Sequence, residues 1–420
     1  MPEQESTPVE RPDTTEEIQD VIERIAREGA RRVLQAALET EVEEHLARYQ
    51  HLRDGQGRKA VVSNGHAPER TILTGVGPVV VRRPRVDERE VQGQAGHEPF
   101  SSAILPRFLR RTPTVEGTLA TLYLKGVSTN DFATALEAIL GPKAVGLSAT
   151  NISRLKRVWE AEYEAWRKRP LECNEYAYLW ADGVYFNVRL EDERSCILVV
   201  VGGNYRGEKE LLAVRDGFRE SEQSWKELLL ELKERGLQID PKLAIADGAL
   251  GFWKALPQVY PSTRTQRCWV HKTANVLDKL PSSLQGRAKA MIHDIYRAES
   301  AASARKAYGL FQSAFQDKYP EAVGCLRKDE ESLFTFYDFP AAHWLHIRST
   351  NVIESVFATV RLRTAKTKGC GTRIATLTMV FRLIQEAQKT WRKLDGSKQL
   401  DLVHAGRRFV DGVLQEVQAA

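Results

Sequence analysis

The sequence lacks any hydrophobic run long enough to cross a membrane. Its longest uninterrupted apolar stretch runs only from Cys196 to Val201, whereas a membrane-spanning helix needs about 20 apolar residues. The first thirty residues are acidic, where a secretory signal would be basic and then apolar. These absences exclude a membrane protein and argue against secretion. We therefore expect a soluble, cytoplasmic protein.

Several catalytic signatures are missing as well. The five cysteines are odd in number and include no C-x-x-C pair, which argues against a disulfide framework and a four-thiolate zinc site. No glycine-rich stretch matches a nucleotide-binding fingerprint, so no nucleotide cofactor is expected. The chain also offers no credible Ser/His/Asp motif. A reducing compartment fits this cysteine usage.

What the chain does have is enough length for several domains and a strongly uneven distribution of charge. It holds 420 residues, of which 42% are hydrophobic, with a net charge of only +5. Residues 1–49 hold 13 acidic and 6 basic side chains (net −7), whereas residues 348–393 hold 10 basic and 2 acidic ones (net +8). This polarity favours a polyanionic partner for the C-terminal part.

Residues 1–50 form an acidic tail followed by helical periodicity. From Thr15 onwards apolar side chains recur at helical spacing among charges, which predicts one or two amphipathic helices. Two interpretations have equal weight. The apolar face could form a dimer seam, or it could pack against the next domain of the same chain.

Residues 51–112 are predicted to contain a small basic β-hairpin. The β-rich runs Thr71–Thr74 and Val79–Arg83 flank a Gly-Val-Gly-Pro turn, and Arg82 and Arg83 lie at its edge. Basic side chains on a β-ribbon suit contacts with DNA phosphates, although isolated surface arginines are common. We expect DNA contact here.

Residues 113–170 resemble a helix-turn-helix DNA-binding domain. Three short helical patterns follow one another, and the third carries Arg154, Lys156 and Arg157 on its outward face. An ordinary helical bundle would show a similar pattern. The interpretation as a DNA reader is therefore a hypothesis on these residues.

Residues 171–420 change to an α/β pattern. Three strand-like segments, Tyr176–Val188, Cys196–Val201 and Glu210–Val214, predict an antiparallel meander; a helix (Trp225–Arg235) and a buried strand (Lys242–Ala246) follow. Residues from about 281 to 340 show only helical spacing and are predicted to be an all-helical insertion. The whole chain is thus expected to be a multidomain α+β protein.

Two aspartates stand in the same unusual setting. Asp182 follows Leu-Trp-Ala and Asp247 follows Ala-Ile-Ala. Each is expected at or near the end of a hydrophobic strand and is followed by a glycine that leaves room for another group. A carboxylate among core residues is costly unless it is paired, hydrogen-bonded or bound to a metal. Glu354 supplies a third carboxylate, and Arg361 and Arg363 lie on or near its helical face. The alternative for Glu354 is a solvated pair with Arg361.

Three carboxylates without a histidine-rich ligand set favour a hard divalent cation. Mg²⁺ is usually held by one or two carboxylates together with phosphate oxygens and water. Two such ions about 4 Å apart would serve phosphodiester chemistry, which requires a nucleic-acid substrate. Cys268 and His271 form a C-x2-H pair that lacks zinc-binding partners at suitable spacing. A structural or hydrogen-bonding role near the active site is favoured for this pair.

These motifs closely resemble the Mutator-like transposases of bacterial insertion sequences, which carry an Asp-Asp-Glu triad. Four segments carry the resemblance: YLWADGVYF around Asp182, IADGALGFW around Asp247, QRCWVHKTANVL around Cys268 and His271, and STNVIESVFATVRLR from Ser349 through Asn351 to Arg363. Glu-Val-Glu-Glu-His-Leu and the Asn64-Gly65 segment extend it into the N-terminal region. The resemblance therefore covers nearly the whole chain.

The resemblance implies a ribonuclease H-like catalytic domain at residues 171–420, interrupted by the helical insertion. Asp182, Asp247 and Glu354 would be the catalytic metal ligands for Mg²⁺ or Mn²⁺, with Cys268, His271 and Asn351 in motifs near the active site. It also implies a bacterial, nucleoid-associated enzyme that binds the terminal inverted repeats of its element as a homodimer or larger synaptic complex. Such an enzyme cuts and joins double-stranded DNA. Expected DNA contacts also include Arg348, Lys366 and Lys368.

Two other functions remain open on the sequence. A domesticated DNA-binding regulator would use the basic segments without catalysis, and the intact carboxylates argue against it. A nuclease or resolvase of the same fold could share the triad, but would not need the N-terminal reader domains.

Overall fold

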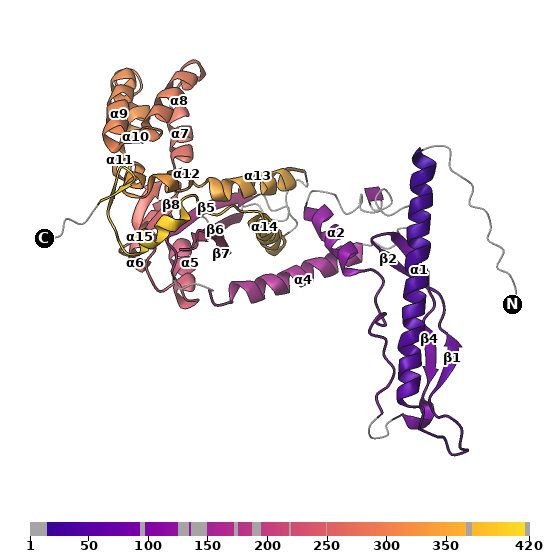
Figure 1. Ribbon diagram of the computed structural model, residues 1–420. Helices are drawn as coiled ribbons and strands as arrows, with labels where there is room; N and C mark the ends of the chain where they lie inside the picture. The colour runs from indigo at the N-terminus through magenta and orange to yellow at the C-terminus, as the bar shows by residue number, and fades with distance from the viewer. Residues whose placement is uncertain are drawn as a thin grey trace. The chain divides into compact units, whose positions relative to one another are not determined.

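The computed structural model describes residues 15–92, 97–124, 134–135, 149–171, 175–186, 195–217, 220–248, 250–366 and 372–415. The chain folds as two compact units, residues 1–152 and 153–420. Figure 1 shows the ribbon of both units. The four-part division expected from the sequence stays a prediction. Three of the five cysteines, Cys196, Cys268 and Cys325, are described and are free thiols.

The first unit is built on one long helix and two β-ribbons. Helix α1 (Thr15–Arg48) is continuous. The expected hairpin is formed by β2 (Arg70–Thr74) and β3 (Gly77–Val81), whose antiparallel register closes at Thr74 opposite Gly77. Gly77 has φ 101°, a conformation that favours glycine at this turn. A second antiparallel ribbon, which the sequence did not predict, joins β1 (Val62–His66) to β4 (Pro84–Asp87).

Helix α1 packs on these ribbons through two small apolar clusters. Leu38 lies in the first cluster with Ile72, Val79, Val81 and Leu105. Tyr49 lies in the second with Ala60, Val61 and Val91, beside the 3-10 turn η1 (Arg89–Val91). The self-packing alternative thus holds for the C-terminal half of α1. Nearer its start, Ile22 and Ile25 are exposed, and the dimer seam stays a prediction.

The predicted three-helix segment lies only partly within the described residues. Its first helix is α2 (Pro113–Leu124) and its third begins α4 (Ala149–Arg167). The intervening helix expected after Ser128 falls outside the described residues apart from residues 134–135. The helix-turn-helix interpretation therefore stays a prediction.

The second unit contains a mixed five-stranded sheet in the order β7-β6-β5-β8-β9. Strands β5 (Tyr178–Phe186), β6 (Ser195–Gly203) and β7 (Lys209–Gly217) form the expected antiparallel meander. Strand β8 (Leu243–Ala246) pairs parallel with β5, and β9 (Arg264–Arg267) pairs parallel with β8. The sequence did not predict β9, because its Arg-Thr-Gln-Arg sequence has no hydrophobic signal. Gln266 is nevertheless fully buried in β9. Its side chain donates a hydrogen bond to the Leu333 carbonyl oxygen and accepts one from the Phe336 amide.

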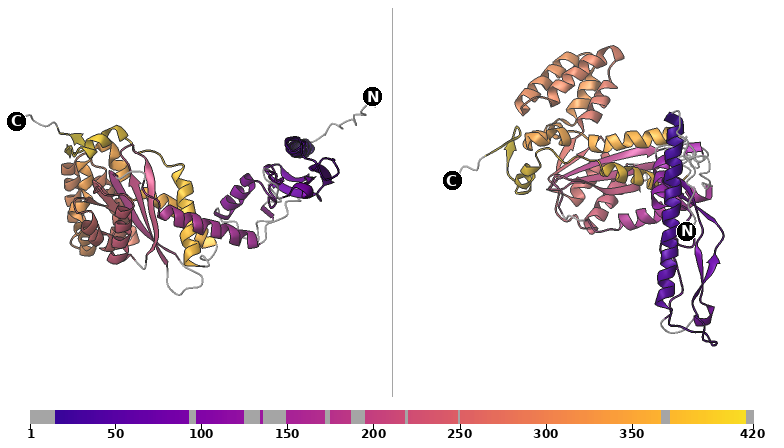
Figure 2. Two further views of the ribbon diagram at one scale, coloured as in Figure 1. Left: turned by 90° about the horizontal axis from the view of Figure 1, so that it is seen from below. Right: turned by 45° about the vertical axis from the view of Figure 1, so that its right-hand side comes forward.

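Helices cover both faces of this sheet (Figure 2). Helices α5 (Glu222–Glu234) and α6 (Leu250–Val259) pack on one face in an apolar cluster that includes Leu179 and Ala181 of β5. Helices α13 (Asn351–Lys366) and α14 (Arg373–Gln388) contact β5, β6 and β7 from the other face. Successive residues of β5 point to opposite faces, so Asp182 lies on the side of α13 and Gly183 on the side of α5.

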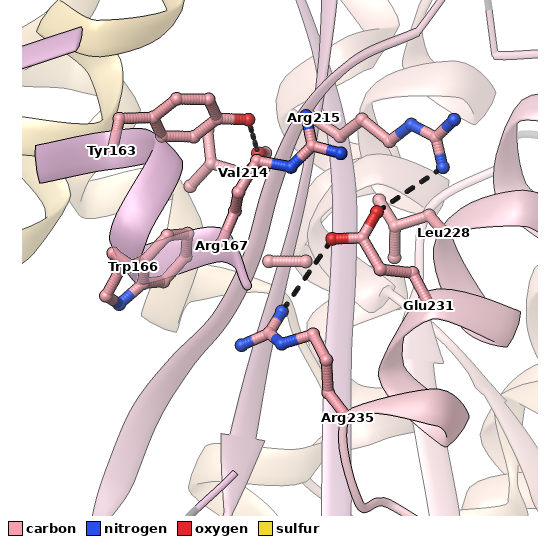
Figure 3. Close-up of a pocket in the computed structure, with 9 residues that line it drawn as sticks. Tyr163, Trp166, Arg167, Val214, Arg215, Leu228, Glu231 and Arg235 are labelled. Atoms are coloured by element: carbon pink, nitrogen blue, oxygen red, sulfur yellow. Dashed lines mark hydrogen bonds and ion pairs between the residues drawn. The ribbon is translucent and has the colours of Figure 1, made fainter. Parts of the chain in front are cut away.

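The C-terminal half of α4 docks at the β7 edge of the sheet (Figure 3). The Tyr163 hydroxyl donates to the Val214 carbonyl oxygen at 2.8 Å. Beside it, Glu231 of α5 lies 3.6 Å from Arg215 and 4.0 Å from Arg235. Aromatic contacts of Tyr163 and Trp166 with Phe381 join α4 to α14 as well.

Helices alone make up the region between β9 and α13, as expected for the insertion. In order they are α7 (Trp269–Leu277), α8 (Ser282–Tyr296), α9 (Ala301–Phe315), α10 (Pro320–Arg327), α11 (Glu330–Leu333), η2 (Thr335–Asp338), η3 (Ala341–His343) and α12 (Trp344–Ile347). After α14 come η4 (Ser397–Gln399), α15 (Leu400–His404) and a short hairpin, β10 (Phe409–Val410) with β11 (Val413–Leu414). No helix in the described part of the chain is both long and apolar enough to cross a bilayer.

Candidate active site

Sheet register brings the two predicted aspartates side by side. The parallel pairing of β5 with β8 ends at Ala181 opposite Ala246, so Asp182 and Asp247 are the next residues on adjacent strands. Cys268 follows β9 in the same row, since Ala246 pairs with Arg267 and the Cys268 amide donates to the Ala246 carbonyl oxygen at 2.9 Å. The carboxyl end of parallel strands is where open α/β sheets bind ligands. Asp247 and Cys268 lie at that end of β8 and β9. Asp182 lies beside Asp247 but within β5, because β5 continues to Phe186 through its pairing with β6.

The backbone of Asp247 is fixed by two side chains. Trp253 Nε1 donates to the Asp247 carbonyl oxygen at 2.8 Å, and the Arg267 guanidinium donates to the same oxygen. Arg267 is itself held by Asp329, 3.1 Å away, and Asp329 also pairs with buried Lys272. An ion-pair network therefore links the helical insertion to the strand end that carries Asp247.

Glu354 lies in the first turn of α13, beside the C-x2-H pair. Its Oε1 accepts a hydrogen bond from Thr350 Oγ1 at 2.8 Å and lies 3.5 Å from His271 Nδ1. Thr350 Oγ1 is also 3.3 Å from Cys268 Sγ, which accepts from the Thr350 amide at the same distance. The pair thus sits in a hydrogen-bonded cluster around Glu354, as its favoured interpretation anticipated. Asn351, the first residue of α13, is exposed.

The surroundings of Asp182 favour the protonated form of its carboxyl. Asp182 is 4% exposed, and its Oδ1 accepts from the Gly183 amide at 2.9 Å. Burial, together with the negative charges of Asp247 and Glu354, raises the pKa of Asp182 to about 7. A buried carboxyl surrounded by other carboxyls is the arrangement that a divalent cation relieves.

A fourth carboxyl, which the sequence analysis missed, lies beside Asp182. A Cβ atom at Gly183 would lie 1.9 Å from Glu220 Oε1, so the Glu220 carboxyl rests on the backbone next to Asp182. Burial and the charge of Asp247 raise the pKa of Glu220 to about 7. Glu220 stands immediately before the Ser221 N-cap of α5. The glycine after Asp182 was the signal, because it marks space for another group.

Two groups of potential ligands, each with atoms within 4.8 Å of one another, occur among the described residues. One is Cys268, His271 and Glu354; the other is His45, Glu88 and His97 in the first unit. Asp182, Asp247 and Glu354 do not form such a group within the described residues. Burial raises the pKa of the Cys268 thiol to about 11, which disfavours a thiolate ligand at neutral pH.

The predicted DNA-binding residues lie in varied surroundings. Arg82 is paired with Glu69 at 2.7 Å, and Arg348 donates to the Tyr296 carbonyl oxygen at 3.0 Å while stacking on its ring. Arg83 is half-buried, and Arg157 and Arg361 are exposed. Lys368 and the side chains of Arg154, Lys156, Arg363 and Lys366 fall outside the described residues. DNA contact by these residues stays a prediction, and Arg348 has a visible structural role.

Sequence comparison gives the class of protein. Residues 2–394 match the family described as "Transposase, Mutator family", so the chain belongs to the Mutator family of transposases. This confirms the resemblance seen in the motifs.

The relatives that the chain resembles are transposases for insertion sequences. It is 49% identical, over 71% of this chain and 92% of the relative, to the transposase for insertion sequence element IS6120 of Mycolicibacterium smegmatis. It is 46% identical, over 66% of this chain and 94% of the relative, to the transposase for element IST2 of Acidithiobacillus ferrooxidans. Among solved structures, the Drosophila P element transposase strand transfer complex is 8% identical over 75% of this chain and 88% of that chain. Its TM-score of 0.28 is too low to bear on the fold.

Proposed function

We propose that this protein is an Asp-Asp-Glu transposase that binds the ends of its insertion sequence and catalyses divalent-metal-dependent DNA cleavage and strand transfer. The observation that carries the proposal is the sheet register, which places Asp182, in the middle of β5, beside Asp247, the residue that follows β8. Glu354 acts electrostatically on Asp182 from the facing helix. Asp182, Asp247 and Glu354 are the proposed catalytic residues.

The donor set fits Mg²⁺ or Mn²⁺ better than a softer metal. Carboxylate oxygens on Asp182, Asp247 and Glu354 would hold the ions. Burial and the charge of Asp247 raise the pKa of Asp182, and a bound cation would offset both effects. Bound divalent ions, two in the proposed active form, would activate the attacking oxygen and stabilise the leaving oxygen at a phosphodiester. Burial raises the pKa of the Cys268 thiol to about 11, which works against a thiolate ligand for zinc at the Cys268 and His271 pair.

Neighbouring residues of this chain position these carboxyls. Thr350 donates to Glu354, and His271 lies within ion-pair distance of the same oxygen. Arg267 and Trp253 hold the carbonyl group of Asp247. These side chains would fix the carboxyls before DNA arrives, so that little reorganisation is needed during reaction.

The sheet order supports a ribonuclease H-like catalytic domain. Along the chain, three antiparallel strands are followed by two parallel ones, and the sheet order is β7-β6-β5-β8-β9. The first strand in the chain, β5, therefore lies at the centre of the sheet, and the fourth, β8, lies beside it. The basic hairpin β2-β3 and the exposed Arg157 of α4 are proposed to contact the DNA ends. A homodimer or larger synaptic complex would bring two ends together.

The test compares strand cleavage with DNA binding on fragments that carry the terminal inverted repeats. Asp182→Ala, Asp247→Ala and Glu354→Ala should each abolish Mg²⁺-dependent cleavage and joining while DNA affinity changes by less than about threefold. The exposed Asp401→Ala is the matched control and should cleave normally.

The same experiment separates the other functions. Binding without cleavage in the parent protein would support a regulator, and cleavage of branched DNA or RNA–DNA hybrids in preference to repeat ends would support a resolvase or nuclease. Normal turnover in any one of the three alanine variants would remove that residue from the triad.

A further inference from the structure

A second cluster of ligand-type side chains lies in the first unit, away from the carboxyls described above in sequence. His45 comes from the last turn of α1, Glu88 precedes η1, and His97 follows it. Glu88 Oε2 lies 3.3 Å from His45 Nε2 and 3.3 Å from His97 Nε2. One ligand atom from each of the three residues lies within 4.8 Å of the other two.

These distances match the edges of a tetrahedral metal site. Zinc binds imidazole nitrogen and carboxylate oxygen at about 2.0–2.2 Å, which separates neighbouring ligand atoms in a tetrahedron by roughly 3.3–3.5 Å. The two distances from Glu88 Oε2, to His45 Nε2 and to His97 Nε2, lie within this range. The contact between His45 Nε2 and Glu88 Oε2 is also a hydrogen bond.

Burial makes the cluster costly without a ligand. The side chain of His97 is 1% exposed. Neither of its ring nitrogens makes a hydrogen bond among the described residues, and only Nε2 lies within ion-pair distance of Glu88. The side chains of His45 and Glu88 are 10% and 16% exposed. A buried polar nitrogen without a partner costs about 1–3 kcal/mol, so His97 points to a missing ligand.

Neighbouring residues hold the three side chains in position for such a ligand. Glu88 Oε1 accepts from the Phe100 amide at 2.9 Å, which leaves Oε2 for the cluster. The Tyr49 hydroxyl accepts from the Glu98 amide at 3.1 Å, and the Tyr49 ring packs 4.9 Å from His97. Such outer contacts orient metal ligands in known sites.

We propose that His45, Glu88 and His97 bind one zinc ion. Two imidazoles and a carboxylate form a set that zinc accepts with water in a fourth position. Residues 1–152 contain no cysteine, so a thiolate zinc site cannot form there. Two imidazoles distinguish this cluster from the all-carboxylate triad proposed for Mg²⁺.

The ion has a structural role in this unit. The unit's apolar clusters are small, and one of them, around Tyr49 and Val91, adjoins the site. Small cores are commonly reinforced by a metal. Zinc here ties the end of α1 to the segments before and after η1, and so fixes the ribbon β1-β4 against the helix.

The experiment measures zinc bound by the full-length protein after equilibration with a zinc buffer and desalting. Glu88→Gln keeps the size of the side chain and its acceptor for Phe100, and His97→Ala removes a ligand. Both should bind zinc at least about 100-fold more weakly than the parent at this site. His66→Ala, an exposed histidine on β1, is the matched control and should bind like the parent.

Cobalt(II) separates this site from Cys268. Cobalt in the proposed site should give visible bands of a tetrahedral ion without the near-ultraviolet band of a cobalt–thiolate bond. The bands should be lost in Glu88→Gln and His97→Ala but kept in Cys268→Ser. Zinc should also raise the melting temperature of the parent and of His66→Ala, and not that of Glu88→Gln. Equal zinc content in the parent and Glu88→Gln, or bands lost with Cys268→Ser, would overturn the proposal.

Discussion

Asp182→Asn is expected to stabilise the metal-free protein at pH 8. The side chain is 4% exposed, and burial with the charges of Asp247 and Glu354 raises its pKa from the ordinary 3.8 to about 7. At 1.36 kcal/mol per pH unit, that difference corresponds to about 4 kcal/mol of unfolding free energy. This is an upper bound, since neighbouring carboxyls share the protons. Asparagine keeps the shape and carries no charge.

The sign follows from proton binding. Below about pH 4 the carboxyl is protonated in both the folded and the unfolded state, and it costs nothing. As pH rises from about 4 to 7, the unfolded chain has lost its proton while the folded chain keeps it, so the free energy of unfolding falls. Above about pH 7 the full penalty is present. The advantage of Asp182→Asn should therefore grow across this window, and at pH 5 it should be less than half its value at pH 8.

The assay is thermal unfolding followed by circular dichroism, in chelator, at pH 5 and pH 8. About 4 kcal/mol corresponds to roughly a 10 °C higher melting temperature for a unit of this size. Asp401→Asn, an exposed aspartate in the same unit, is the control and should melt like the parent at both pH values. Excess Mg²⁺ should stabilise the parent more than Asp182→Asn. An equal or lower melting temperature for Asp182→Asn at pH 8, or a difference independent of pH, would refute the reasoning.

Three further predictions concern the surroundings of the site. Asp329→Asn should lower the free energy of unfolding by about 3 kcal/mol, because it leaves buried Lys272 without its ion-pair partner. Chemical denaturation at pH 7 measures this change, and an unchanged midpoint would contradict the prediction. Thr350→Val should slow strand cleavage about tenfold with unchanged DNA affinity, since it removes the hydrogen bond to Glu354. Thr350→Ser keeps the hydroxyl and should cleave at the parent rate. A loss of DNA binding in Thr350→Val would count against this role. Arg361→Ala should weaken binding to all DNA sequences and lower the slope of log affinity against log salt concentration by about one, the loss of one phosphate contact. Filter binding at several salt concentrations measures both effects. A loss of affinity confined to repeat ends would contradict the prediction.

Local patterns in the sequence predicted most of the elements. Helical spacing after Thr15 gave α1, and the runs on either side of the glycine turn gave β2 and β3. The hydrophobic segments before Asp182 and Asp247 indicated two core strands, although only Asp247 follows the end of its strand, since β5 continues past Asp182 to Phe186. These features depend on residues close in sequence, so a single chain read along its length reveals them. The family likewise followed from motifs, each confined to about a dozen residues.

Tertiary structure decided what those patterns could not. Strand β9 is polar and becomes a strand because it pairs with β8. Parallel register, fixed across 65 residues, aligns Asp182 with Asp247 and admits Glu220 over Gly183. His45 and His97 are apart in sequence and meet only because α1 packs along the ribbons. Which distant side chains share a site depends on strand register and helix packing, which are properties of the folded chain as a whole.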